Sequence, residues 1–148
     1  MEFTSRSLAE TEILAQRFMG ELEARAGRAT IVGLSGDLGS GKTAFVHASA
    51  RTLGVVDKIT SPTFVIIKTY DLAGKPWKRM VHIDAYRLKS GKELAGLKFG
   101  DLATDPGNII FIEWRENVAE ILPKDAQNID FKFVSENVRQ IKIPSPTE

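Results

Sequence analysis

The chain has 148 residues, enough for one domain with a core, and its 43% hydrophobic and 26% charged residues are ordinary for a globular protein. Its net charge of +1 excludes the strongly basic surface of a self-sufficient nucleic-acid binder, and the absence of cysteine excludes disulfides and thiolate metal sites. No apolar run approaches membrane-spanning length. Residues 1–6 have no apolar block behind them, so we expect a cytoplasmic protein without a secretory signal.

Hydrophobic periodicity predicts helices and strands in alternation along the first third of the chain. The first element is a helix over residues 7–26, where Ser7 and Glu10 form a capping box and Gly27 follows the last turn. A buried strand over residues 29–35 comes next. A glycine-rich segment then leads into a helix over residues 42–53.

The rest of the chain is richer in strands. The predicted elements are a strand over residues 63–70, a turn over 73–76, a strand over 79–85, a short helix over 90–95, an apolar strand over 108–112 and a short helix over 118–121. Alternating apolar residues from Ile129 to Ile143 predict an antiparallel hairpin that turns at Glu136-Asn137. We therefore expect an α/β fold with a mixed central sheet flanked by helices.

The glycine-rich segment matches the phosphate-loop pattern G-x-x-x-x-G-K-[ST] in full, as Gly36-Asp37-Leu38-Gly39-Ser40-Gly41-Lys42-Thr43. Its glycines let consecutive N–H groups point at phosphate oxygens, and the helix that follows adds its positive dipole end. Lys42 suits the β- and γ-phosphates, and the Thr43 hydroxyl suits magnesium. An incidental glycine loop is the alternative. The position between an apolar strand and a helix favours nucleotide binding and a P-loop NTPase-type domain over residues 1–148.

Two acidic residues follow predicted strands, and a phosphate loop needs such an acid to hold magnesium. Glu113 follows the apolar residues 109–112, the usual form of a Walker B strand, whereas Asp84 follows the less apolar residues 81–83. Asp84 shares one strand face with His82 and Tyr86. Each acid has the alternative of being a solvated strand end, and periodicity does not rank them.

Further features also have two interpretations each. Trp114 is either a core side chain or a contact of the nucleotide or of a partner. Arg87 and Arg115 are either phosphate contacts or surface ion-pairing residues. The segment Ser61-Pro62-Thr63-Phe64 is either a turn or, as in many phosphate-loop proteins, the part that senses the γ-phosphate.

Four motifs, in order, resemble the bacterial tRNA threonylcarbamoyladenosine biosynthesis protein TsaE family of small P-loop ATPases. The loop is similar to the family's GDLGAGKT and differs at Ser40, and residues 61–64 match its SPTF segment. Residues 82–88 resemble its HFDLYRL segment, and residues 112–114 match its IEW segment. The resemblance covers nearly the whole chain. One departure is Arg115, where the family often has proline.

The resemblance implies site residues. It places Asp84 and Glu113 at the magnesium site beside Thr43, with Lys42, Asp84 and Glu113 as the catalytic residues. Thr11 and Arg139 fall on positions that contact the nucleotide. The ligands implied are ATP and Mg²⁺, and residues 61–64 would be the switch.

The resemblance also implies an accessory role. ATP hydrolysis would drive or reset the TsaD–TsaB complex, which transfers threonylcarbamoyl to the adenosine beside the tRNA anticodon. Contact with tRNA would be indirect, through that complex, and no membrane is implied. No arginine finger is evident, so we expect slow hydrolysis by the chain alone.

Two other functions are weighed beside this one. A small-molecule kinase needs an acceptor pocket and usually a lid that carries arginines, and no arginine-rich lid segment follows residues 42–53. A non-catalytic nucleotide switch would act through the shape of its ATP-bound state alone.

Overall fold

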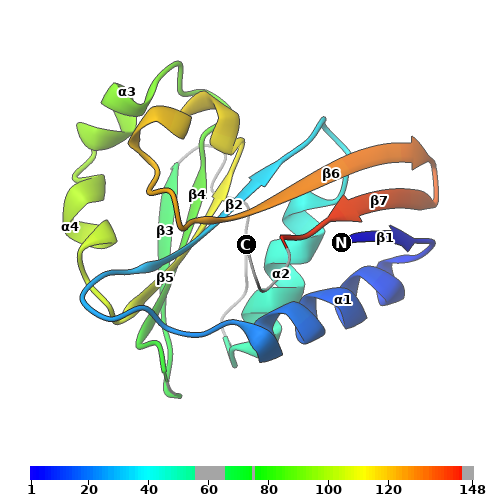
Figure 1. Ribbon diagram of the computed structural model, residues 1–148, viewed down its shortest axis with the longest axis horizontal. Coiled ribbons are helices and arrows are strands. Elements are labelled where there is room, and N and C mark those ends of the chain that lie inside the picture. The colour runs from blue at the N-terminus through cyan, green and yellow to red at the C-terminus, as the bar shows by residue number, and fades with distance from the viewer. Residues whose placement is uncertain (56–65, 75, 145–148) are drawn as a thin grey trace.

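Seven strands form one sheet in the described part of the chain, in the spatial order β1-β7-β6-β2-β5-β4-β3 (Figure 1). The computed structural model describes residues 1–55, 66–74 and 76–144. The strands are β1 (Glu2–Ser5), β2 (Thr30–Ser35), β3 (Ile67–Asp71), β4 (Arg79–Asp84), β5 (Asn108–Glu113), β6 (Gln127–Ser135) and β7 (Val138–Lys142).

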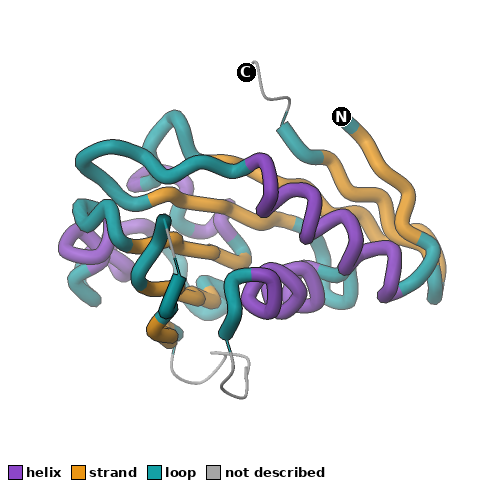
Figure 2. Tube along the Cα trace, turned by 90° about the horizontal axis from the view of Figure 1, so that it is seen from below, coloured by secondary structure: helices purple, strands orange, loops and turns teal. Residues whose placement is uncertain are grey.

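Helices pack on both faces of this sheet. They are α1 (Leu8–Glu21), α2 (Lys42–Thr52), α3 (Gly91–Ala95), α4 (Phe99–Ala103) and the 3₁₀ turns η1 (Arg115–Asn117) and η2 (Ala119–Ile121). In both views α1 and α2 lie side by side (Figure 1, Figure 2). No helix in the described ranges is long and apolar enough to cross a membrane.

The sheet is mixed, as predicted. Strand β2 runs parallel to β5 and β6, and β4 runs parallel to β5, whereas the β6–β7, β1–β7 and β3–β4 pairs are antiparallel. Because β2, β4 and β5 are parallel, their carboxyl ends meet at one edge of the sheet. That edge carries the start of the glycine-rich loop, Asp84 and Glu113.

Alternating side chains of the central strands supply two hydrophobic cores. On β2, Val32 and Leu34 pack with Phe45 of α2 and Phe18 of α1, while Ile31 faces the opposite side. That opposite core includes residues of β4, β5, α3 and α4. Both faces of β5 are buried, which explains its unbroken apolar run.

Helix α1 begins as predicted and ends earlier. The Ser7 hydroxyl accepts the Glu10 backbone N–H at 3.1 Å, and the Glu10 carboxylate accepts the N–H of Arg6 at 3.0 Å. The helix stops at Glu21 because Leu22 turns to an extended conformation and packs against the core. The prediction that it continues to residue 26 was wrong.

Three elements, β1, α4 and η1, were not predicted, and a fourth was predicted as the wrong type of helix. Strand β1 is short and lies at the edge of the sheet, where it pairs with β7. Helix α4 has only five residues. The short helix expected over residues 118–121 is the 3₁₀ turn η2, preceded by η1. The strand expected over residues 63–70 is described from residue 67 onward, as β3.

Candidate nucleotide-binding site

The glycine-rich loop (residues 36–43) joins β2 to α2 and borders a pocket of about 370 Å³. The pocket lies at the sheet edge where β4 and β5 end. Its lining consists of residues 38–44 of the loop and the start of α2, together with Asp84, Tyr86, Glu113 and Trp114. The structure thus brings together the loop, both candidate acids and the tryptophan that the sequence singled out.

The loop backbone needs its glycines. Gly36, Gly39 and Gly41 have φ values of 143°, 76° and 104°, in the region that L side chains rarely adopt. A Cβ atom on Gly36 would lie 2.4 Å from the Phe131 carbonyl oxygen, so a side chain there would clash with β6. The curled backbone leaves the first turn of α2 facing the pocket.

Lys42 lies across the mouth of the loop. Its Nζ donates to the Gly36 carbonyl oxygen and to that of Asp37, the latter at 3.0 Å. The same atom lies 4.1 Å from the centroid of the Trp114 ring, in a cation–π contact. Burial lowers the pKa of Lys42 and outweighs the opposing effect of nearby carboxylates, Glu113 first among them. The loop therefore holds a partly desolvated ammonium group where a phosphate would approach.

Thr43 and Glu113 are hydrogen-bonded across the pocket, with Oγ1 2.7 Å from Oε1 of the carboxylate. The other oxygen of Glu113 lies 2.6 Å from Nε2 of His82, and Glu113 is only 3% exposed. Burial raises the pKa of Glu113, but hydrogen bonds from His82 and Thr43 and the charge of Lys42 more than offset it, and the net shift is downward. The carboxylate is thus ionised and held at both oxygens.

Asp84 is the direct neighbour of Glu113 across the β4–β5 pair. It is 8% exposed and lines the pocket, and its Oδ1 accepts the Tyr86 backbone N–H at 3.0 Å. The two acids that periodicity left unranked therefore stand side by side. Neither is a solvated strand end.

Trp114 is half-buried, packs against one of the two hydrophobic cores and also lines the pocket. It adopts a left-handed conformation with φ of 61°, and its ring packs against that of Tyr86 with centroids 5.0 Å apart. Tyr86 is 48% exposed. The aromatic pair lines the pocket beside the Lys42 side chain of the loop.

Arg115, where the family often has proline, ties the segment after β5 to β6. Its guanidinium donates to Asp130 Oδ1 at 2.6 Å, and the Ser35 hydroxyl donates to the same oxygen at 2.6 Å. Its side chain crosses Gly33 so closely that a Cβ there would lie 2.6 Å from Arg115 Cδ. Of the two interpretations of Arg115, the structure shows ion pairing.

Thr11 and Arg139 border a neighbouring pocket of about 240 Å³ that shares Gly41 and Ala44 with the loop region. Arg139 Nε donates to the Gly39 carbonyl oxygen at 2.8 Å, and Thr11 is hydrogen-bonded to Ser5 at 2.7 Å. The structure therefore places both residues beside the loop.

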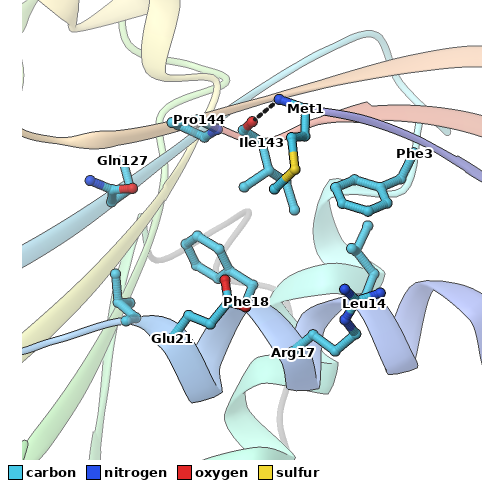
Figure 3. Close-up of a pocket in the computed structure, with 10 residues that line it drawn as sticks. Met1, Phe3, Leu14, Arg17, Phe18, Glu21, Gln127, Ile143 and Pro144 are labelled. Carbon is cyan, nitrogen blue, oxygen red and sulfur yellow. Dashed lines mark hydrogen bonds between the residues drawn. The ribbon is translucent and has the colours of Figure 1, made fainter. Parts of the chain in front are cut away.

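The expected switch, Ser61, Pro62, Thr63 and Phe64, lies outside the described residues. Another cavity of about 90 Å³ lies away from the loop, between α1 and the end of β7 (Figure 3). Apolar side chains such as Phe3, Phe18 and Ile143 dominate its lining. Among the described residues, no group of three or more His, Asp or Glu side chains that could hold a metal borders it.

The donor set in the main pocket fits a magnesium–phosphate ligand better than a bare metal ion. In the described ranges, no group of three or more His, Asp or Glu side chains is arranged to hold a metal by itself. Mg²⁺ usually keeps several waters and binds through one or two carboxylates plus substrate phosphates. A hydroxyl, two carboxylates and an open loop of N–H groups match that requirement.

Comparison with known proteins identifies the family. The family model "Threonylcarbamoyl adenosine biosynthesis protein TsaE" matches residues 5–141. The chain belongs to the TsaE family. The tRNA threonylcarbamoyladenosine biosynthesis protein TsaE of Borreliella burgdorferi is 39% identical over 102 residues, which are 68% of this chain and 72% of that protein. TsaE of Rickettsia prowazekii is 33% identical over 141 residues, 95% of this chain and 92% of its own.

A solved structure agrees with the TsaE assignment. The crystal structure of YdiB from Bacillus subtilis superposes with a TM-score of 0.72 at 26% identity, covering 97% of this chain and 83% of that one. The resemblance on four short motifs is thus confirmed over the whole fold. The sequence did not point to His82 as a partner of Glu113. The available signals were its position two residues before Asp84 on the same strand face and its place at the start of the segment that resembles HFDLYRL.

Proposed function

We propose that this TsaE-family chain binds ATP with Mg²⁺ at residues 36–43 and hydrolyses it as an accessory to tRNA threonylcarbamoylation, in the cytoplasm with the TsaD–TsaB complex. The observation that carries the proposal is the hydrogen bond between Thr43 and Glu113, with Asp84 beside them and Lys42 at the loop mouth. A hydroxyl, two acids and a lysine at one end of a glycine loop are the parts that phosphoryl transfer requires.

Each group would have a stated task. The N–H groups of the loop and the start of α2 would bind phosphate oxygens. Lys42 would leave the carbonyl oxygens of Gly36 and Asp37 and donate to the β- and γ-phosphates instead. Thr43, Asp84 and Glu113 would hold magnesium, directly or through water, and a bound magnesium ion would offset the negative charge on the phosphates.

Hydrolysis also needs a water molecule in line with the γ-phosphate. Asp84 and Glu113 both flank the pocket at the required end, so either carboxylate is suited to orient it. The variants Asp84→Asn and Glu113→Gln separate these tasks, because each removes a charge with little change of shape. The variant that keeps ATP affinity while losing hydrolysis identifies the residue that orients the water.

One part of a fast phosphoryl-transfer site is missing from the pocket lining that the structure describes. No arginine is among the residues described as lining it, and Arg115 is engaged by Asp130. A well-placed arginine typically accelerates such a reaction by about 10³–10⁵-fold. We therefore expect slow hydrolysis by the chain alone and faster hydrolysis with TsaD–TsaB. Equal rates with and without the complex would contradict this.

The test is reconstituted threonylcarbamoylation of tRNA over many turnovers, comparing wild type with Lys42→Ala. Lys124→Ala is the matched control, because Lys124 is exposed and lies away from the pocket. We expect Lys42→Ala to abolish sustained modification and Lys124→Ala to preserve it. Full activity of Lys42→Ala would remove the loop from the mechanism. Sustained activity of a variant that binds but does not hydrolyse ATP would indicate a non-catalytic switch.

A further inference from the structure

His82 is a buried polar residue that the tasks above leave unassigned. It lies on β4 with no exposed surface, on the face that packs against α2. Its Nε2 lies 2.6 Å from Glu113 Oε2, and its ring meets that of His47 edge-on with centroids 6.5 Å apart. His82 is not among the described residues that line the pocket, and its hydrogen bond to Glu113 links it to that lining.

The direction of the hydrogen bonds follows from the chemistry of Glu113. An ionised carboxylate only accepts hydrogen bonds, so His82 donates through Nε2–H and Thr43 donates through its hydroxyl. A hydroxyl that donates its proton to Glu113 keeps its lone pairs for another ligand. The three residues therefore form a chain, His82 to Glu113 to Thr43, with each proton directed toward the carboxylate.

We propose that His82 is a positioning residue: it fixes the Glu113 carboxylate, and through it the Thr43 hydroxyl, in the orientation that a magnesium–nucleotide ligand requires. This inference rests on the proposed function for its catalytic consequence. A carboxylate held at one oxygen rotates about its terminal bond, whereas one held at both does not. Partners that orient the groups around a metal site typically change affinity or activity by about 10–100-fold when removed.

A purely structural role for His82 makes a different prediction. If the imidazole only filled space between β4 and α2, any side chain of similar volume would serve. If it positions Glu113, the replacement must present a donor where Nε2 lies. The Gln side-chain amide reaches about as far as Nε2, whereas the shorter Asn amide does not. The variants His82→Gln and His82→Asn are therefore chemically alike and differ in reach.

The experiment measures Mg-dependent ATP hydrolysis by wild type, His82→Gln, His82→Asn and the control His47→Gln. The control removes the neighbouring imidazole, whose Nε2 has no hydrogen-bond partner among the described residues and which is not one of the residues lining the pocket. We expect His82→Asn to lower kcat by about 10–100-fold with KM for ATP within about twofold. We expect His82→Gln to recover most of that loss and His47→Gln to stay within about twofold of wild type.

A second readout needs neither nucleotide nor metal. In the ligand-free protein, the Nε2–H proton of His82 should give a protected, downfield NMR signal that moves upfield in Glu113→Gln. Absence of that signal, or its indifference to Glu113→Gln, would overturn the inference even if His82→Asn does not fold. A folded His82→Asn with wild-type kcat, or a His82→Gln no better than His82→Asn, would overturn it as well. If the wild-type protein neither binds nor hydrolyses ATP, the proposed function is contradicted. The inference about His82 and Glu113 is not, because the NMR test uses the ligand-free protein.

Discussion

The Thr43 hydroxyl lies 2.7 Å from Oε1 of Glu113, although the two residues are 70 positions apart in the chain. Thr43 lies in the first turn of α2, and Glu113 is the last residue of β5. Strand β2 ends directly before the loop, and β5 runs parallel to β2. The pairing of these two strands therefore sets the distance between Thr43 and Glu113. The hydrogen bond joins the loop to the acid that the sequence marked as a Walker B residue.

Replacement of Thr43 by valine tests that hydrogen bond. Valine keeps the volume and removes the hydroxyl, so one oxygen of the buried Glu113 loses its donor. We expect Mg-dependent hydrolysis to fall by about 100-fold or more, the scale seen when one preorganised group is lost. We expect stability to fall by about 1–3 kcal/mol. Hydrolysis assays and urea denaturation check both, with Thr43→Ser as the control that keeps the hydroxyl. A Thr43→Val variant as active as Thr43→Ser would contradict the assignment.

Glycine 36 should tolerate no side chain. At Gly36 φ is 143°, and a Cβ would lie 2.4 Å from the Phe131 carbonyl oxygen. We therefore expect Gly36→Ala to lower the free energy of unfolding by about 1–3 kcal/mol from backbone strain, and by a further amount from the clash. Gly39→Ala is the matched control, because φ is also positive there, at 76°, but an added Cβ would have no described atom within 4 Å. It should cost about 1–2 kcal/mol. Equal midpoints of chemical denaturation for the two variants would show that β6 does not restrict the loop.

Trp114 should report the arrival of a nucleotide. Its ring contacts the Lys42 ammonium at 4.1 Å, and Lys42 must change partners when phosphate binds. The other tryptophan, Trp77, is buried and donates to Thr30. In Trp77→Phe we therefore expect ATP to change the remaining fluorescence in a saturable way. Loss of the same signal in Trp114→Phe is the control. Unchanged emission of Trp77→Phe at saturating ATP would contradict the proposed movement of Lys42.

The Asp130 ion pair predicts a pH dependence of stability. Burial raises the pKa of Asp130, but hydrogen bonds from Ser35 and Arg115 outweigh that effect and lower it. A depressed pKa contributes stability that is present above the ordinary aspartate value of about 3.9 and lost as the pH falls below it. Because Asp130 is half exposed, we expect about 1 kcal/mol or less. Urea midpoints of wild type and Asp130→Asn should differ at pH 7 and converge below about pH 3.9. A constant difference would contradict this origin.

Local patterns predicted the centre of the fold well. The apolar patterns of β2, β5 and α2 are strong, and the glycine-rich motif with its lysine marks the boundary between β2 and α2. Each of these elements was therefore predicted within two residues of its bounds. Strand β1 has no such pattern. It forms because residues 2–5 pair with β7, about 137 positions away, which no local window reveals.

The candidate site divides in the same way. Residues 36–43 form a local motif, so spacing alone identified them. The relative placing of Asp84 and Glu113 depends on the register of β4 with β5, which brings these two residues directly opposite each other. The contact of His82 with Glu113 depends on that register too. Periodicity predicts the face of a strand on which a residue lies. Only the pairing of strands decides which residues of two neighbouring strands lie side by side on that face.

Direct binding of MgATP tests the central claim, that residues 36–43 form a nucleotide site. Calorimetric titration should show one MgATP bound per chain for wild type and for Lys124→Ala. Lys42→Ala should bind about 10–100-fold more weakly, since a hydrogen bond to a charged group contributes about 1.5–3 kcal/mol. Equal affinity of Lys42→Ala and wild type, or no binding by wild type, would contradict the account.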